Sequence, residues 1–225
     1  MYGILGYPLG HSFSKGWFEA KGYEFENFEC QSVEEFMAKR PEGLVGFSVT
    51  IPHKEAIIPF LDSVDEVARE VGAVNCVRAR EGKLEGFNTD VIGFRESIAP
   101  LIKEWHKRAA VLGSGGASKA VVWALRSMGL ECSVVSRKGD GYDYFDPSEV
   151  DVIVNTTPLG MFPKIDAFPP IDYSEIREHT ICYDLVYNPG ETLFLKLCRG
   201  RGAVVMGGIE MLRIQAEAAL RLYEE

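Results

Sequence analysis

Apolar runs of strand length alternate with longer segments of helical spacing over the second half of the chain. The runs occupy residues 109–112, 132–135, 152–154, 181–186 and 204–206. Strands separated by helical segments pair in parallel and are covered on both faces of the sheet. This half is therefore predicted to form a doubly wound, Rossmann-like parallel sheet.

The first half has shorter apolar and alternating segments, which predict a smaller α/β domain. Residues 54–61 follow Pro52 and are predicted to form a helix, and residues 90–105 a long connecting helix. Residues 80–84 carry a turn signal that predicts a hairpin turn. The remaining predicted elements are strands at 2–6, 24–29, 45–49 and 74–79, and a helix at 33–38.

The last segment, residues 208–223, has apolar side chains at helical spacing. It is predicted to form an amphipathic helix. The pattern alone allows this helix to pack on either half of the chain.

A glycine-rich turn follows the first strand of the predicted parallel sheet. It reads Gly113-Ser114-Gly115-Gly116-Ala117 and continues into a helical segment. Glycines let the backbone approach a pyrophosphate, and the N–H groups at a helix start favour an anion. Such turns also occur without a ligand, so the motif alone is a weak indication of a dinucleotide site.

The end of the next predicted strand indicates which dinucleotide is bound. Ser136, Arg137 and Lys138 stand where NAD-binding folds place an acid against the ribose 2′-hydroxyl. Two cations suit a 2′-phosphate, which favours NADP as the cofactor. The alternative is a solvated turn, and Asp140 leaves NAD open.

Composition restricts the partners. The chain has 225 residues, of which 33 are acidic and 24 basic, for a net charge of −9. That charge opposes binding to nucleic acid or an anionic membrane, so a small-molecule ligand is expected. No signal-like or membrane-spanning apolar stretch stands out, which predicts a cytoplasmic protein. The five cysteines lack metal or redox spacing, so reduced thiols and no metal site are expected.

Seven short segments resemble the signatures of the shikimate dehydrogenase family, in the same order along the chain. They are GYPLGHSFS at 6–14, GFSVTIPHK at 46–54, GAVN at 72–75, GFNTD at 86–90, NTTPLGM at 155–161, YDLVYNP at 183–189 and MLRIQA at 211–216. The chain departs from the family after Ser14, where Lys15 and Gly16 replace the usual proline segment, and at Ser136, where asparagine is common.

The resemblance implies an NADP-dependent, reversible reduction of 3-dehydroshikimate to shikimate, in the biosynthesis of aromatic amino acids. It also implies a split substrate-binding domain, residues 1–100 and 207–225, into which the last helix returns. Residues 101–206 would form the NADP-binding domain.

The resemblance assigns catalysis to Lys54 and Asp90. Reducing a ketone requires a proton on oxygen as well as a hydride on carbon, and a positioned lysine can supply that proton. Asp90 would orient Lys54 and hydrogen-bond a ring hydroxyl. In the predicted helix, Lys54 lies in the first turn, where the dipole would lower its pKa. Without the resemblance, a solvated lysine and a helix-capping aspartate are the simpler interpretations.

The resemblance also assigns the binding residues. Ser12, Ser14 and Tyr187 would bind the substrate carboxylate, and Thr50, Asn75 and Gln215 its ring hydroxyls. Asn155, Thr156 and Thr157 end a strand of the parallel sheet and are expected beside the cofactor. Met211 would lie near the nicotinamide, although a core methionine is the alternative.

Two other functions remain open at this point. One is a quinate/shikimate dehydrogenase that uses NAD, and the other is a non-catalytic, nucleotide-responsive binding module on the same fold. Both a monomer and a homodimer are compatible with the sequence.

Overall fold

The computed structural model describes residues 1–9, 13–137 and 141–225. The chain forms two compact units. The first unit comprises residues 1–89 and 216–225, and the second comprises residues 90–215. Across the described ranges, no helix combines the length and the apolar content that a bilayer span requires.

The first unit is built on a six-stranded mixed sheet with the order β2-β1-β3-β5-β6-β4. β1 pairs in parallel with both β2 and β3, whereas β5 is antiparallel to β3 and β6. The strands are β1 (Tyr2–Gly6), β2 (Phe25–Glu29), β3 (Gly46–Val49), β4 (Ser63–Val64), β5 (Cys76–Arg80) and β6 (Lys83–Phe87). The helices are α1 (Phe13–Ala20), α2 (Val33–Lys39) and α3 (Glu66–Val71).

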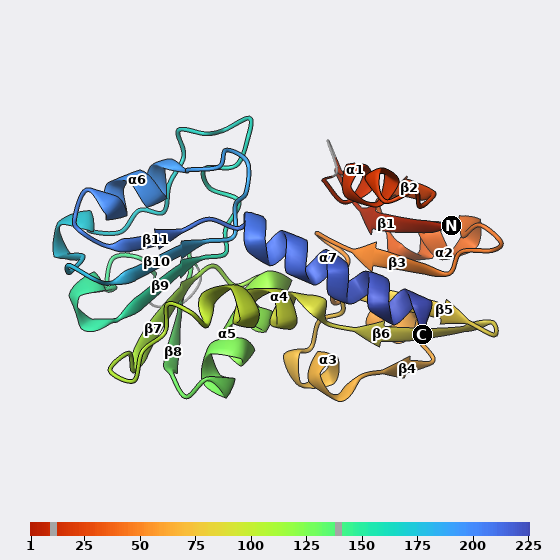
Figure 1. Cartoon of the computed structure of the whole chain (residues 1–225), viewed down its shortest axis with the longest axis horizontal. Helices are drawn as coiled ribbons and strands as arrows, with labels where there is room; N and C mark the ends of the chain where they lie inside the picture. Colours follow the sequence, from red (N-terminus) through yellow and green to blue (C-terminus); the bar gives the residue numbers. More distant parts are fainter. Residues whose placement is uncertain (10–12, 138–140) are drawn as a thin grey trace. The chain divides into compact units, whose positions relative to one another are not determined.

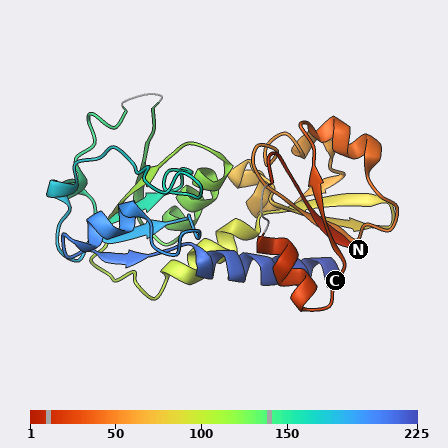
Figure 2. The ribbon, with the colours of Figure 1, turned by 90° about the horizontal axis from the view of Figure 1, so that it is seen from above.

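Alternating side chains of this sheet build a core on each face. Leu5 and Phe47 join a cluster that includes Phe36 of α2. Ile4 joins the opposite cluster with Phe18 of α1. Figure 2 shows α1 and α2 on opposite faces of the sheet.

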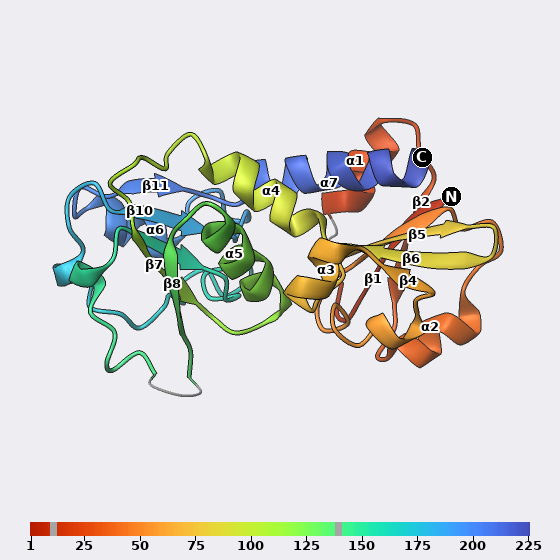
Figure 3. The same ribbon diagram turned by 90° about the horizontal axis from the view of Figure 1, so that it is seen from below.

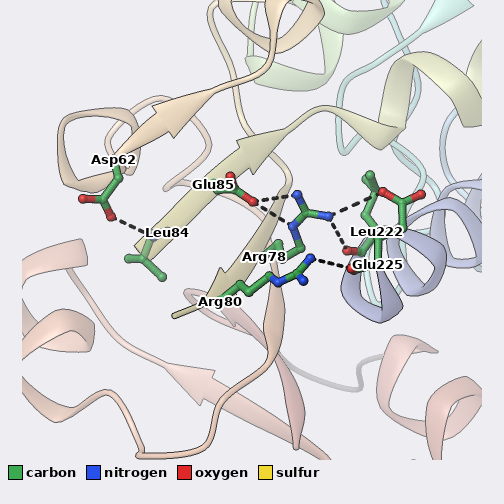
Figure 4. Close-up of polar contacts among 7 residues, drawn as sticks. All are labelled: Asp62, Arg78, Arg80, Leu84, Glu85, Leu222 and Glu225. Atoms are coloured by element: carbon green, nitrogen blue, oxygen red, sulfur yellow. Dashed lines mark hydrogen bonds and ion pairs between the residues drawn. The ribbon is translucent and has the colours of Figure 1, made fainter. Parts of the chain in front are cut away.

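The last helix, α7 (Ile209–Glu224), ends within the first unit. Arg78 and Arg80 of β5 hold its C-terminal end (Figure 4): Arg78 donates to Leu222 O at 3.4 Å, and Arg80 donates to Glu225 O at 2.6 Å. Arg78 also pairs with Glu85 of the neighbouring strand at 2.7 Å. The expected return of the C-terminal helix to the first part of the chain is thereby confirmed.

The second unit has a five-stranded, entirely parallel sheet with the order β11-β10-β9-β7-β8. The chain runs outward from β7 to β8 and then from β9 to β11 in the opposite direction. Right-handed crossovers therefore place α5 and α6 on opposite faces, as Figures 1 and 3 show. The elements are α4 (Thr89–Ile98), β7 (Arg108–Leu112), α5 (Gly116–Ser127), β8 (Glu131–Val135), β9 (Val152–Asn155), β10 (Ile181–Asp184), α6 (Leu193–Arg199) and β11 (Val204–Met206).

Both faces of the central strands β7, β9 and β10 are buried, as their continuous apolar runs predict, whereas the edge strands β8 and β11 are partly exposed. On one face, Leu112 and Ile153 pack in a cluster with Phe194 of α6. On the other, the hydroxyl of Tyr183 lies 2.8 Å from Ser97 Oγ of α4, and its ring contacts Phe94. The predicted doubly wound α/β fold is confirmed.

Two predicted helices are wrong or too long. Residues 54–57 form turns, followed by one short 3₁₀ turn, Ile58–Phe60, instead of an α-helix. Pro59 disfavours α geometry at the residue before it, which explains the tighter turn. α4 ends at Ile98 rather than residue 105, close to Pro100. Because residues 54–57 form turns, Lys54 does not lie in the first turn of a helix, contrary to the prediction.

Candidate active site

The glycine turn lies at the point where the strand order of the second sheet reverses. β7 and β9 are neighbours here, and ligands of doubly wound sheets bind outside the carboxyl ends of such strands. Gly113 has φ +117°, and a Cβ placed on it would lie 2.6 Å from Thr156 Oγ1. Both the backbone conformation and the close threonine therefore require glycine at this position.

The start of α5 is open to a ligand. Its N-cap is Gly115, which has no side chain to cap the helix, and no heavy atom lies within 4 Å of its ideal Cβ position. Ser118 Oγ donates to Gly113 O at 2.8 Å, which fixes the turn against the helix. Ser114 and Gly115 are exposed, and Gly116 and Ala117 are half-buried. The first N–H groups of α5 can therefore meet an anion.

The residues predicted to bind the 2′-phosphate follow β8. Ser136 is half-buried and Arg137 is exposed. Lys138 lies outside the described residues. Arg137 therefore supplies a guanidinium at the carboxyl end of β8, the strand next to the one that carries the glycine turn.

The loop after β9 packs directly on the glycine turn. Thr156 donates to Leu112 O through both its N–H, at 2.9 Å, and its Oγ1, at 2.8 Å. Asn155 is fully buried, and its Oδ1 accepts from the N–H and the hydroxyl of Thr157, at 3.0 and 2.6 Å. The amide of Asn155 is thus used inside the protein, whereas Thr156 and Thr157 are half-buried.

Asp184, at the end of β10, is a buried carboxyl group that the sequence interpretation missed. Its Oδ1 accepts from Asn155 Nδ2 at 2.9 Å and from Val186 N at 3.0 Å, and its Oδ2 accepts from Thr192 Oγ1 at 2.6 Å. Burial raises the pKa of Asp184 to about 6, because its effect is larger than that of the three hydrogen bonds, which lower the pKa. An acidic residue inside the apolar run 181–186 was the signal that could have identified it.

In the first unit, the carboxyl ends of the three parallel strands gather at one edge of the sheet. Thr50 N donates to Leu5 O at 2.8 Å, which keeps the segment after β3 beside β1. The buried ring of His53 places Nε2 2.8 Å from Cys30 O, just beyond β2. Lys54 follows and accepts from Val74 N through its backbone carbonyl at 2.7 Å. Thr50 and Lys54 therefore lie at this edge, and both are half-buried.

Asn75 lies at the same edge, because β5 runs antiparallel to β3 and begins where β3 ends. Its side chain is buried and bonded to Thr89: Oδ1 accepts from Thr89 N at 2.6 Å and Nδ2 donates to Thr89 Oγ1 at 3.0 Å. Asn88 donates to Ala73 O at 2.8 Å. These bonds fix the first residue of α4, and Asp90 is the next residue in the chain. The side chain of Asp90 is buried.

The remaining predicted binding residues are spread over both units. Ser14 is buried in α1, whereas Ser12 lies outside the described residues. Met211 and Gln215 are buried in α7, where Gln215 Nε2 donates to Leu212 O at 3.0 Å. Tyr187 is half-buried, and burial raises its pKa. Within the described parts of the chain, no cluster of three or more histidine, cysteine or carboxylate residues could hold a metal.

These features define a two-unit α/β protein whose second unit has a glycine turn at the switch point of a Rossmann-type sheet. The family model for the shikimate dehydrogenase substrate binding domain matches residues 4–77.

Three relatives illustrate the similarity. A shikimate dehydrogenase (NADP(+)) of Caldanaerobacter subterraneus subsp. tengcongensis is 35% identical over 258 residues, covering 99% of this chain and 91% of that protein. A shikimate dehydrogenase (NADP(+)) of Oleidesulfovibrio alaskensis is 36% identical over 249 residues, covering 99% of this chain and 89% of that protein. The Thermus thermophilus shikimate 5-dehydrogenase, solved in complex with NADP(H) and shikimate, is 33% identical with a TM-score of 0.87, covering 99% and 92%. The chain belongs to the shikimate dehydrogenase family.

Proposed function

We propose that this protein catalyses the reversible, NADPH-dependent reduction of 3-dehydroshikimate to shikimate, a step in aromatic amino-acid biosynthesis. It is then an NADP-dependent oxidoreductase acting on a CH–OH group. The observation that carries the proposal is the similarity to NADP-dependent shikimate dehydrogenases over 99% of the chain.

The two parts of the chain are proposed to bind the substrate and the coenzyme separately. Residues 1–100 and 207–225 are proposed as the substrate-binding domain, and residues 101–206 as the NADP-binding domain. The family match at residues 4–77 and the coenzyme turn after β7 support this division.

NADP is proposed to bind at the carboxyl ends of β7, β8 and β9. The open N-terminus of α5 would receive the pyrophosphate, and Arg137 with Ser136 and Lys138 would receive the 2′-phosphate. Thr156 and Thr157, held by Asn155, would form the wall of the coenzyme site. Met211 is proposed near the nicotinamide.

The proposed chemistry assigns the proton to Lys54. Bound NADPH supplies the hydride that is added to the carbonyl carbon. Lys54 donates a proton to the carbonyl oxygen as the hydroxyl forms, and takes it back in the reverse reaction. Asp90 orients the ammonium and a ring hydroxyl. The hydrogen bonds between Asn75 and Thr89 support this role, because they fix the backbone directly before Asp90.

Substrate recognition is proposed to depend on hydroxyl and amide groups. Ser12, Ser14 and Tyr187 would donate hydrogen bonds to the carboxylate, whereas Thr50, Asn75 and Gln215 would contact the ring hydroxyls. We also propose that the enzyme acts in the cytoplasm, as a monomer or a homodimer.

The test follows NADPH absorbance after 3-dehydroshikimate is added, with NADH and 3-dehydroquinate as the other arms. Consumption of NADPH with 3-dehydroshikimate is expected. Preferential use of NADH and 3-dehydroquinate would instead assign a quinate dehydrogenase. Coenzyme binding without turnover across a range of pH would assign the non-catalytic binding module.

A further inference from the structure

We propose that Asp184 is a positioning residue for the coenzyme: its carboxylate holds Asn155, and Asn155 in turn holds the Thr156–Thr157 loop against the glycine turn. The inference rests on the proposed function, because it assumes that the glycine turn binds NADPH.

The first step is the position of the carboxylate. Asp184 ends β10, whose register places it opposite Asn155, the last residue of β9. Asp184 is fully buried, and both of its oxygens accept hydrogen bonds from groups that belong to other segments or to the turn that follows it. A carboxylate buried this deeply carries a desolvation cost that a purely apolar core position would avoid.

The second step is the way Asn155 connects Asp184 to the loop that follows β9. Its Nδ2 donates to Asp184 Oδ1 at 2.9 Å, which directs Oδ1 of the amide toward the loop that follows. That Oδ1 then accepts both donors of Thr157, the N–H at 3.0 Å and the hydroxyl at 2.6 Å. Without the carboxylate, Nδ2 would keep only its longer hydrogen bond to Leu159 O, at 3.4 Å, so the amide would be held less firmly in this orientation.

The third step is the contact with the coenzyme turn. Thr156 donates two hydrogen bonds to Leu112 O, one from its N–H and one from its hydroxyl. Both threonines also occupy the space that a side chain on Gly113 would need: Thr156 Oγ1 lies 2.6 Å and Thr157 Cγ2 lies 3.1 Å from the ideal Cβ position of Gly113. A shift of the loop would therefore change the space beside the turn. Asp184 itself is fully buried, so its effect on the coenzyme is indirect.

The experiment measures the Kd of NADPH by fluorescence for the wild type, Asp184→Ala and Asp184→Asn, with urea unfolding measured alongside. Asp184→Ala removes the shorter of the two hydrogen bonds that Asn155 Nδ2 donates and leaves only the one to Leu159 O at 3.4 Å, and we expect Kd to rise roughly tenfold or more. Asp184→Asn keeps one oxygen for Asn155 and Val186 and offers an N–H to Thr192, so it should stay within about threefold of the wild type.

The matched control is Asp151→Ala. Asp151 also accepts three hydrogen bonds, from the backbone N–H groups of Lys107 and Arg108 and from Arg177 Nη2, but it lies at the amino ends of the strands, away from the coenzyme turn. We expect this variant to lose stability and to keep its Kd for NADPH. An equal loss of affinity in Asp151→Ala and Asp184→Ala would overturn the inference, because general destabilisation would then explain both.

Two other results would overturn it. One is wild-type affinity in a folded Asp184→Ala variant, and the other is an Asp184→Asn variant that binds as weakly as the alanine variant. If Asp184→Ala does not fold, the test uses Asn155→Ala, in which Asp184 keeps its hydrogen bonds from Val186 and Thr192. An unchanged Kd for NADPH in Asn155→Ala would contradict the proposed connection between Asp184 and the coenzyme. A wild type that neither binds NADPH nor reduces 3-dehydroshikimate refutes the proposed function itself. A wild type that does both, with unaffected variants, refutes only the role of Asp184.

Discussion

The ring of Tyr223, near the end of α7, packs on the backbone of Gly46 in β3, with its hydroxyl 3.3 Å from Ser48 Oγ. Any Cβ at residue 46 would overlap this ring, which is itself buried and stacked on Tyr2 with ring centroids 5.3 Å apart. The contact joins the last turns of the chain to the first sheet. The contribution of this contact to stability can therefore be tested by adding a single methyl group at residue 46.

Gly46→Ala should lower the free energy of unfolding by about 1–3 kcal/mol, because the enclosed ring cannot move without disturbing its neighbours. Urea unfolding measures this change. The matched control is Gly16→Ala in α1, where no heavy atom lies within 4 Å of the ideal Cβ. That variant should be neutral or slightly more stable, because alanine is the better helix former. Equal stability of the two variants would contradict the packing described for Tyr223.

Lys54→Ala should reduce kcat for 3-dehydroshikimate by about 10²–10⁴-fold, the usual contribution of a general acid, with only a modest change in KM. Steady-state kinetics with saturating NADPH measure both constants. Lys83→Ala, at the exposed start of β6, is the control and should retain full activity. Near-normal kcat in the Lys54 variant would remove this lysine from the mechanism.

Arg137→Gln should weaken NADPH by about 10–100-fold, because a charge-assisted hydrogen bond to the 2′-phosphate is lost, and should leave NADH nearly unchanged. Fluorescence titration of each coenzyme gives the two Kd values. Arg108→Gln at the amino end of β7 serves as the control, since it removes the same charge far from the carboxyl ends of the strands. Equal losses for NADPH and NADH would contradict a contact with the 2′-phosphate.

The two glycines of the coenzyme turn should respond differently to alanine. Gly113→Ala should lower both stability and affinity for NADPH, because φ +117° is strained for alanine and Thr156 blocks its methyl group. Gly115→Ala has an ordinary φ of −86° and open space, so stability should be retained while NADPH binding weakens. Calorimetry and coenzyme titration separate these effects. Tight NADPH binding by Gly115→Ala would exclude the pyrophosphate from the start of α5.

Asp184 should make the protein less stable as pH rises. Its carboxyl has a pKa of about 6 in the folded protein and an ordinary value of 3.8 when unfolded, so the folded state binds more protons between these values. The contribution of Asp184 to the free energy of unfolding therefore falls as pH rises from about 3.8 to about 6, by up to about 3 kcal/mol in total. Asp184→Asn cannot titrate, and its unfolding free energy relative to wild type should increase from pH 4 to pH 7.

The ionisable neighbours of Asp184 do not change this sign. Burial raises the pKa of Tyr173 and of Tyr183, the latter to about 12. A hydrogen bond with Cys182, together with burial, raises the pKa of Cys198. All three groups remain neutral between pH 4 and pH 7. Urea unfolding at several pH values tests the prediction, and a constant difference between wild type and Asp184→Asn would contradict the raised pKa.

Local pattern accounts for most of the secondary structure. Most strands of both sheets, helix α2 and the hairpin at Glu81-Gly82 follow from apolar alternation and turn residues, and the positive φ values of Glu81 and Gly82 fit that hairpin. The failures, at residues 54–61 and at the end of α4, occur where prolines interrupt helical spacing. The short strand β4 and the helices α1 and α3 were not predicted, because elements of two to eight residues carry little periodicity.

By itself, the sequence determined the parallel α/β class of the second unit, the glycine turn with its following cation, and membership of the family, because each is encoded in short contiguous segments. Only the tertiary structure decided that Asp184 holds Asn155, 29 positions away, and that Tyr223 closes over Gly46. Such partners are chosen by strand register and packing. Periodicity along a chain indicates which face of an element is buried, but it does not indicate which distant side chain will satisfy a buried carboxylate or fill the space above a glycine.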